Sequence, residues 1–353
     1  MPGRTRAALG PMRLRLALGA FVVVQLLVAC GPAASGSPRL VASGSAAPPT
    51  PLTVGLGYIP SVQFAQFYLA QQAGYYRDGG LQVTFQNKID PDLVTLVGQG
   101  TIDVGISDGT SVIPAVSQGI PVRYVATIYA QFPNVVYAKQ ASGIKTAGDL
   151  RGRKLGTPGK YGSSWIMLQA LLSSAGLRPS DLDIELYPDF GQGAALAQGA
   201  VDAATGFINN EPVQLELSGT RSTVLRVDQA VPLPGNGLIA GTSAISSKAT
   251  QLRAFIAATL RAMQEIEADP RKGLDAAIAA VPTLGQDRRT QLAILKATIG
   301  TWSSDYTAAH GAGAVDQAAW AKTVTFMASL SDSPISGTPP GVPQLIDTSL
   351  LPS

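Results

Sequence analysis

Two short segments of the sequence match each other and begin at residues 99 and 198. QGTIDVGIS and QGAVDAATG each combine a Gln-Gly pair, an apolar residue, an aspartate and a run of small or β-branched residues. A glycine after a helical segment is typical of a helix end, where a positive φ is needed, and the run after the aspartate predicts a short strand. We expect Asp103 and Asp202 to shape turns. The repeat predicts two similar α/β units.

The chain from Leu52 onward alternates between β-branched and Ala/Leu-rich segments. Strands are predicted at 52–57, 81–86, 104–106, 122–128, 135–138, 154–156, 184–187, 203–207 and 222–226, with helices at 63–73, 91–98, 164–175 and 193–198. This alternation is typical of parallel sheets covered by helices. The prediction is therefore an α/β fold of two lobes, joined by two crossing strands that act as a hinge, with a cleft between them.

The expected lobe boundaries follow from the Pro- and Gly-containing segments near 135–143 and 232–241, where the chain should cross. Lobe 1 is then 52–140 with 238–353, and lobe 2 is 141–237. After Ile245 the pattern is helical, with an amphipathic stripe that begins at a Ser246 or Ser247 N-cap and ends before Pro270. Further helices are predicted at 288–299 and 317–328, and 345–351 is expected to dock as a strand or turn.

The N-terminal segment carries the basic charge of the chain. Residues 1–29 have no acidic residue, and removing their four arginines from the formal charge of +3 leaves −1. The apolar run 16–29 is short and interrupted, which is typical of a signal peptide rather than a membrane span. Without this segment the chain has no basic surface suited to nucleic acid, so nucleic-acid binding is excluded.

The signal-like segment ends in Leu27-Val28-Ala29-Cys30, which resembles a bacterial lipobox. Cys30 is the one cysteine in the chain, so we expect it to be lipidated and not to form a disulfide within the chain. Residues 30–51 are rich in Gly, Ala, Ser and Pro and are predicted to be a disordered tether. We expect a protein anchored by lipid to the extracytoplasmic face of the cell membrane.

Catalytic motifs are scarce in this sequence. His310 is the one histidine and lies in a Gly/Ala-rich segment, where no third group would hold it as a base. Zinc sites need several Cys or His ligands, and no P-loop, dinucleotide or EF-hand motif occurs. We therefore predict that the protein is not an enzyme and needs no cofactor or metal. We also expect it to be a monomer.

The loops that follow predicted strands carry the candidate ligand-binding residues, because open α/β sheets bind ligands at the carboxyl ends of their strands. The candidates are Tyr58, Gln63, Phe64, Ser107, Asp108, Tyr129, Tyr161, Ser163, Asn209, Asn210, Glu211 and Asn236. Asp108 is as well explained by helix capping. Glu211 would also suit the start of a helix, with Asn210 as the N-cap.

The composition of these loops indicates the chemistry of the ligand. They are rich in aromatic and amide side chains, and Lys160 is their one basic residue. A site for sulfonate, phosphate or nitrate would need more positive charge or more backbone amides. Aromatic faces with amides and a carboxylate at the edge suit a flat ring. The sequence favours a neutral aromatic heterocycle.

Several of these segments resemble a known superfamily. They are Gly57-Tyr58-Ile59-Pro60 with FAQFYLAQQAGYYRDGGLQVTF, then LVGQGTIDVGIS, LRGRKLGTPG and GFINNEPVQLE. Over roughly residues 52–245 the chain resembles the substrate-binding lipoproteins of bacterial ABC importers that include thiamine-pyrimidine, riboflavin and alkanesulfonate binders. The resemblance implies the bilobal fold of type 2 periplasmic binding proteins, and partnership with an ABC permease and its ATPase.

The resemblance also bears on the ligand. Glu211-Pro212 is similar to the pyrimidine-binding branch, but that branch has an Asp-Trp-x-Pro-Asn loop and then a histidine, where this chain has Gly57, Tyr58 and Phe64. The more aromatic first loop is similar to the riboflavin binders, so riboflavin or a related flavin-like ring is expected. The alternatives are a thiamine pyrimidine precursor, a sulfonate- or nitrate-type anion, or an enzyme of pyrimidine synthesis, as eukaryotic members of the superfamily are.

Overall fold

The computed structural model describes residues 48–87, 92–228 and 230–352. The predicted signal peptide, Cys30 and most of the predicted tether lie outside these residues. Strand β1 begins at Thr50, inside the segment predicted as tether. In the described ranges we find no helix with the length and apolar character needed to cross a membrane.

The first sheet has five strands in the order β2-β1-β3-β10-β4. They are β1 Thr50–Gly55, β2 Leu81–Gln86, β3 Val104–Ser107, β4 Val122–Thr127 and β10 Gly237–Gly241. Strand β1 pairs in parallel with β2 and β3, whereas β10 is antiparallel to both β3 and β4.

The second sheet repeats this plan in the order β7-β6-β8-β5-β9. Its strands are β5 Asn134–Lys139, β6 Lys154–Thr157, β7 Asp183–Leu186, β8 Ala203–Phe207 and β9 Ser222–Arg226. Strand β6 is parallel to β7 and β8, and β5 is antiparallel to β8 and β9. The antiparallel strand of each sheet is the one that enters from the other lobe, so both sheets are mixed rather than wholly parallel.

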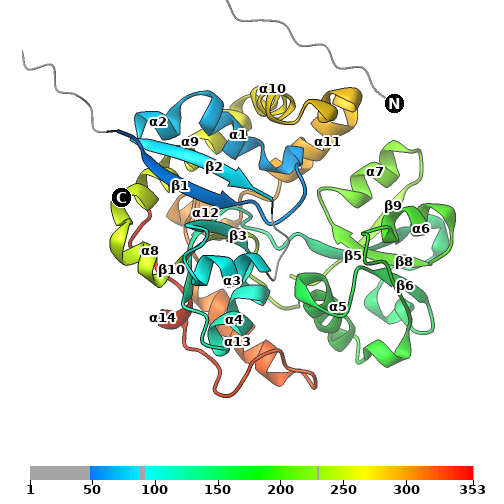
Figure 1. The fold of residues 1–353 in the computed structure, drawn as a ribbon. Helices are drawn as coiled ribbons and strands as arrows, with labels where there is room; N and C mark the ends of the chain where they lie inside the picture. The colour runs from blue at the N-terminus through cyan, green and yellow to red at the C-terminus, as the bar shows by residue number, and fades with distance from the viewer. Residues whose placement is uncertain (1–47, 88–91, 229, 353) are drawn as a thin grey trace, which may run out of the picture. The chain divides into compact units, whose positions relative to one another are not determined.

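Helices surround each sheet (Figure 1). With the first sheet lie α1 Ala65–Gln72, α2 Tyr75–Asp78, α3 Asp92–Gly98, α4 Gly109–Ser117, α8 Thr242–Ser247, α9 Ala249–Ala268, α10 Pro270–Ala280, α11 Arg288–Ile299, α12 Asp305–His310, α13 Gln317–Ser329 and α14 Val342–Leu345. With the second lie α5 Gly162–Ser174, α6 Gln192–Gln198 and α7 Glu211–Leu217. The two sheets with their helices confirm the predicted pair of α/β lobes.

The sequence repeat corresponds to the same turn in both lobes. The Asp103 carboxylate accepts a hydrogen bond from the backbone N–H of Thr53 on β1 at 2.8 Å, and the Asp103 N–H donates to the Thr53 carbonyl at 3.0 Å. Asp202 and Lys154 on β6 make the same two bonds at 3.0 and 2.9 Å. Each aspartate therefore fixes the start of one strand against its parallel neighbour, as the turn-shaping role predicts.

The change from the first sheet to the second occurs earlier than the expected boundary at residue 140. Strand β5, Asn134–Lys139, pairs with β8 and β9 in the second sheet, so the first crossing is the segment between Thr127 and Asn134. The second crossing connects Arg226 of β9 to Gly237 of β10. The assignment of Asn134–Lys139 to lobe 1 is wrong, because its backbone hydrogen bonds are made with lobe 2.

The C-terminal region is helical, as predicted, with two differences. A separate short helix, α8, contains Ser246 and Ser247, and α9 begins at Ala249 after Lys248 without a side-chain cap. Chain segment 345–351 docks on the first sheet through an isolated parallel bridge between Ile346 and Tyr124. The predicted N-cap at Ser246 or Ser247 is therefore wrong, and the predicted docking is confirmed.

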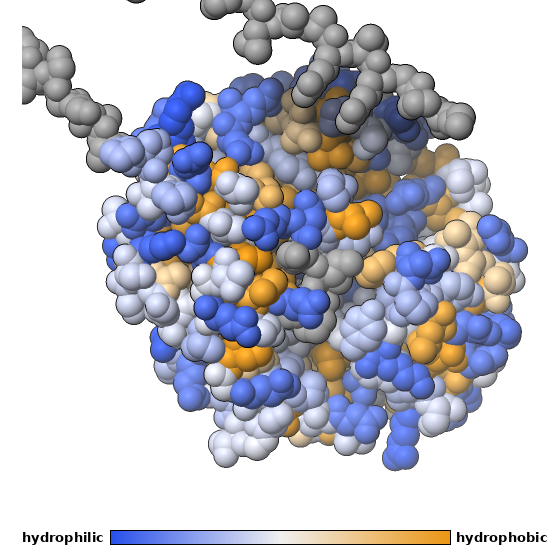
Figure 2. Space-filling model, viewed as in Figure 1, coloured by the Kyte–Doolittle hydropathy of each residue, from blue (hydrophilic) through white to orange (hydrophobic). Residues whose placement is uncertain are grey.

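Apolar contacts join the two lobes. Ile166 of α5 is buried in the core beneath α3 and α4, and Val213 of α7 packs against the core of the first lobe. Phe326 of α13 packs against cores in both lobes. On the face drawn in Figure 2, apolar residues occur in scattered patches among hydrophilic ones. The lobes are thus in contact in this structure.

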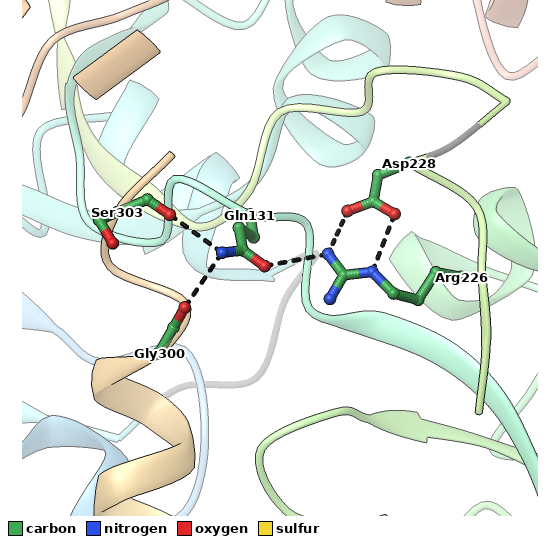
Figure 3. Close-up of polar contacts among 5 residues, drawn as sticks. All are labelled: Gln131, Arg226, Asp228, Gly300 and Ser303. Atoms are coloured by element: carbon green, nitrogen blue, oxygen red, sulfur yellow. Dashed lines mark hydrogen bonds and ion pairs between the residues drawn. The ribbon is translucent and has the colours of Figure 1, made fainter. Parts of the chain in front are cut away.

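A polar network also ties the crossings together (Figure 3). The Gln131 amide of the first crossing donates to the carbonyls of Gly300 and Ser303 at 3.1 and 3.0 Å. Its oxygen accepts from the Arg226 guanidinium at 3.1 Å, and Arg226 forms an ion pair with Asp228. One glutamine therefore connects both crossings to the loop after α11.

We predict that Gln131→Ala lowers the free energy of unfolding by about 1–2 kcal/mol, because three hydrogen bonds are lost and the Arg226 side chain loses a partner. Urea denaturation measures this change. Gln72→Ala, which alters an exposed glutamine of α1, is the matched control. An effect of Gln131→Ala no larger than that of the control would contradict a joining role for this network.

Candidate ligand-binding site

A cavity of about 160 Å³ lies where loops of both lobes meet. Its walls come from the segments that follow β1, β3, β6 and β8, which are the carboxyl ends of parallel strands. The lining residues are Leu56, Gly57, Tyr58, Gln63, Phe64, Gln66, Ile106, Ser107, Asp108, Ile128, Tyr129, Pro158, Tyr161, Gly162, Ser163, Ser164, Phe190, Gln192, Gly206, Phe207, Asn210, Glu211 and Asn236. Of the twelve candidates named from the sequence, all except Asn209 line it.

The loop after β1 forms the first wall. Gly57 has a φ of 74°, and a Cβ there would lie 3.0 Å from the Ile106 carbonyl oxygen, so glycine permits both the turn and the close approach of the strands. Ser61 then caps the turn Val62–Phe64 by accepting from the Gln63 N–H at 3.3 Å. This local geometry brings the half-buried Tyr58 and the buried Phe64 to the same cavity.

Asp108 lies between the end of β3 and the start of α4. One carboxylate oxygen accepts hydrogen bonds from the Thr110 N–H and hydroxyl at 2.8 and 2.5 Å and from the Ser111 N–H at 3.2 Å. Burial raises the pKa of the Asp108 carboxyl, and hydrogen bonds from Thr110, Ser111 and Ser163 oppose that rise. Asp108 is therefore the N-cap of α4, as expected, and also lines the cavity.

Glu211 forms part of the opposite wall. Its carboxylate accepts from the Phe207 N–H at 2.8 Å, and a Cβ on Gly206 would lie 2.9 Å from the same oxygen. Gly206 thus leaves room for the carboxylate against the end of β8. The residue as a whole is half-buried, and desolvation of the carboxyl raises its pKa while the bond from Phe207 opposes the rise.

Asn209 and Asn210 have structural roles that differ from those expected. Asn209 is fully buried and donates to the Gln63 amide oxygen at 2.9 Å and to the Thr298 hydroxyl at 2.8 Å. It thereby connects lobe 2 to lobe 1 behind the cavity and does not line it. Asn210 occupies the N-cap position of α7 but makes no side-chain cap, because its oxygen accepts from Gln214 at 2.8 Å.

Aromatic rings enter the cavity from both lobes. Phe64 and Tyr129 of lobe 1 are buried, and burial raises the pKa of Tyr129. Tyr161 of lobe 2 is 54% exposed although it lines the cavity. Phe190, which the sequence reasoning missed, contacts Tyr58 with ring centroids 5.9 Å apart and planes at 87°. Its loop follows β7 just as the other site loops follow their strands, which is the signal that could have found it.

Amide oxygens without a protein donor lie beside the cavity. Among the described residues, Gln66, Gln192 and Asn236 line the cavity and each has a buried side-chain oxygen that accepts no hydrogen bond. The Gln192 amide donates to the Thr205 carbonyl at 3.2 Å, which fixes the orientation of this side chain. Gln66 and Gln192 were not predicted, because each lies within a helix and not in a loop.

Basic side chains are missing from the cavity lining. None of its described lining residues is Lys, Arg or His. Lys160, the one basic residue in the sequence of the predicted loops, lies with its ammonium 5.9 Å from the centre of the Trp165 ring. His310 is exposed at the end of α12, where it stacks on Tyr306, and not in a loop as expected. A candidate ligand therefore meets carboxyl groups, amides and rings in this cavity.

A second cavity, of about 400 Å³, borders the crossings near Gln131 and Asp228. Of the residues predicted to bind ligand, Tyr129 alone lines it. The first cavity, at the strand ends, is therefore the candidate site.

Comparison with known proteins agrees with this architecture. The model of the family described as NMT1/THI5 like matches residues 61–273. The chain is 31% identical over 336 residues to the riboflavin-binding protein RibY of Chloroflexus aurantiacus, covering 92% of this chain and 95% of that protein. It is 27% identical over 183 residues to the 4-amino-5-hydroxymethyl-2-methylpyrimidine phosphate synthase of Legionella pneumophila, covering 52% of this chain and 57% of that protein.

A solved structure extends the comparison to the fold. The crystal structure of the periplasmic aliphatic sulphonate binding protein SsuA from Escherichia coli is similar with a TM-score of 0.60 at 20% identity, covering 70% of this chain and 84% of that chain. This likeness shows the bilobal fold of periplasmic binding proteins, as predicted. The resemblance inferred from the loop motifs is confirmed by a family match over more than half of the sequence, and the chain belongs to the NMT1/THI5-like family.

Proposed function

We propose that this chain captures an uncharged aromatic heterocycle, riboflavin or a related flavin-like ring, in the cavity between its lobes and delivers it to an ABC permease. The observation that carries the proposal is the lining itself: two carboxyl groups, several amides and aromatic rings, with no basic side chain among the lining residues that the structure describes. A ligand that suits this lining donates hydrogen bonds and has a flat apolar face.

The isoalloxazine ring of riboflavin matches these features. It is planar and uncharged, carries an imide N–H, and is attached to a hydroxyl-bearing side chain. The ring can stack against Tyr58 and Tyr161, while the imide and hydroxyl donors meet the carboxyl groups of Asp108 and Glu211. The match to RibY over nearly the whole of both chains supports the same ligand class.

An anionic ligand fits the lining less well. A sulfonate or nitrate beside two carboxyl groups would meet repulsion, and Lys160 lies against Trp165 instead of in the cavity. The resemblance in fold to SsuA carries no ligand preference at this level of identity. A thiamine pyrimidine precursor is a smaller alternative with ring donors, and the match to the Legionella synthase makes it a useful competitor to test.

The proposed mechanism is capture by hinge closure. The ligand enters when the lobes are apart, binds to one wall, and is enclosed when the second lobe closes. The buried bridge from Asn209 to Gln63 and Thr298 supports the closed arrangement. The permease and its ATPase then take the ligand, with no catalytic step on this chain, and lipid on Cys30 keeps the protein at the extracytoplasmic membrane surface.

We expect riboflavin to bind with a dissociation constant at or below the micromolar range, measured by quenching of flavin fluorescence. Flavin recovered from the complex should be chemically unchanged. Absence of binding by both riboflavin and 4-amino-5-hydroxymethyl-2-methylpyrimidine at millimolar concentration would exclude this ligand class. Tight binding of an alkanesulfonate that displaces riboflavin would favour the anion alternative.

Tyr58→Ala and Glu211→Ala should each weaken riboflavin binding by about 1–3 kcal/mol, because a ring contact or a charge-assisted hydrogen bond is lost. Lys160→Ala is the matched control and should leave the affinity unchanged, since its side chain packs on Trp165. Urea denaturation of each variant separates a binding defect from a folding defect. A large loss for Lys160→Ala with none for Glu211→Ala would reverse the assignment of the site.

The affinity should also depend on pH through Glu211. A ligand donor binds the ionised carboxylate, whereas desolvation in the free protein raises the pKa and favours the protonated form. Affinity therefore rises with pH over the range in which this carboxyl ionises in the free protein, a range that desolvation moves above the ordinary pKa of the group, and levels off once the carboxyl is ionised. Fluorescence titrations between pH 4.5 and 8 measure the slope, on the order of tenfold in affinity per pH unit at most.

Glu211→Gln should reduce this dependence to the part that Asp108 contributes, while keeping the size of the side chain. Asp149→Asn is the control, because the Asp149 carboxyl is exposed and hydrogen bonds from Lys145 and Thr146 lower its pKa. If Glu211→Gln and the wild type gave the same slope, Glu211 would not be the titrating group.

A further inference from the structure

Phe190 has a backbone conformation that its side chain disfavours. Its φ is 62°, and among the described residues it is the one non-glycine residue with a positive φ. It lies in the turn between β7 and α6, where its N–H donates to the Tyr187 carbonyl at 2.9 Å and Asp189 accepts from the Gly191 N–H at 3.1 Å. Glycine would adopt this turn without strain, so the turn alone does not explain a phenylalanine.

The ring of Phe190 extends from lobe 2 to lobe 1 at the candidate cavity. It lines the cavity and is 38% exposed, and it meets Tyr58 edge to face with centroids 5.9 Å apart. Tyr58 lies in the loop after β1, so the pair connects loops from different sheets. An exposed apolar ring on a strained backbone is costly unless it contributes a contact elsewhere, and the contact here is with Tyr58.

This contact differs from the buried connections between the lobes. Asn209 is fully buried where it meets Gln63 and Thr298, and Ile166 is enclosed in a core. The Phe190–Tyr58 pair is partly in solvent, so the two rings can separate without exposing a core or leaving a buried polar group unpaired. This contact is therefore suited to opening at the cavity.

We propose that Phe190 is an aromatic gate of the candidate site, which packs against Tyr58 to retain a flat ligand and separates from it to release one. The inference rests on the proposed function for the nature of the ligand. The contact between the rings is independent of that function. The strained turn holds the ring toward the opposite lobe, so the gate closes without a ligand-induced change in the turn.

Kinetic measurements on riboflavin test the gate. Phe190→Gly should raise the dissociation rate constant about 2- to 10-fold, the loss expected for one aromatic pair, and the association rate constant should not fall, because the same contact is present without ligand. Phe190→Leu, which keeps apolar volume but removes the ring, should give an intermediate increase. Leu186→Ala is the matched control, because Leu186 is a 50% exposed apolar residue of the same lobe that does not line the cavity.

The stability of the free protein separates a gate from a structural turn residue. Phe190→Gly removes the strain of the positive φ, so urea denaturation should show a folded state as stable as the wild type or more stable. Faster dissociation with unchanged or higher stability supports the gate. Dissociation rates equal to the wild type in both Phe190 variants, or a loss of stability that accounts for the weaker binding, would overturn it.

Cross-linking tests the contact without any ligand. Because Cys30 is the one cysteine in the sequence, the full chain with Cys30→Ser, Tyr58→Cys and Phe190→Cys carries a thiol on each side of the cavity. A short bis-maleimide should link them within the chain, and linkage formed with riboflavin present should slow its dissociation. The control pairs Tyr58→Cys with Gln72→Cys, an exposed position of α1. If the Phe190 pair gave no more internally linked protein than this control, the gate would be overturned. If the wild type bound no flavin, the proposed function would fail, and the cross-linking result would still decide whether positions 58 and 190 meet across the cavity.

Discussion

The candidate site depends on two carboxyl groups that line a cavity and have no basic partner among the residues described in the structure. Asp108 and Glu211 are both desolvated, and burial raises the pKa of each. A carboxyl in this position is stabilised by hydrogen-bond donors, which the protein supplies in part through Thr110, Ser163 and the Phe207 N–H. Both residues line a cavity that is also lined by aromatic rings. Such a site repels anions and favours an uncharged, flat ligand with N–H or O–H groups.

The fold produces this site by using the same unit twice. Parallel strands direct their carboxyl ends toward the space between the sheets, and the Asp103 and Asp202 turns set equivalent strands in register. The single antiparallel strand of each sheet, β10 or β5, enters from the other lobe. Because only two segments cross, a few polar contacts around Gln131 and a buried bridge at Asn209 connect the halves. The cavity is therefore assembled from loops that are far apart in the sequence.

Much of this architecture could be predicted from the sequence, because the alternation of strands and helices and the repeated Gln-Gly…Asp pattern reflect local chemistry. The entry of the chain into the second sheet at Asn134 could not be predicted. A buried strand has the same apolar pattern in either sheet, and the partners of this strand lie far away in the sequence. The loops that follow predicted strands correctly placed Tyr58, Asp108, Tyr161 and Glu211 around one cavity. Asn209 was predicted to bind ligand but does not line the cavity, because its amide donates to Thr298 of α11, which is far away in the sequence. Phe190 was missed although its loop follows a predicted strand, and its positive φ is not indicated by the propensity of phenylalanine.

A crystal structure of the protein with bound riboflavin is the decisive measurement on this cavity. We predict the flavin ring between aromatic side chains of the two lobes, with its N–H or hydroxyl donors within hydrogen-bond distance of the Glu211 or Asp108 carboxyl group. Flavin bound elsewhere on the chain, or an anion held in this cavity by Lys160, would contradict it.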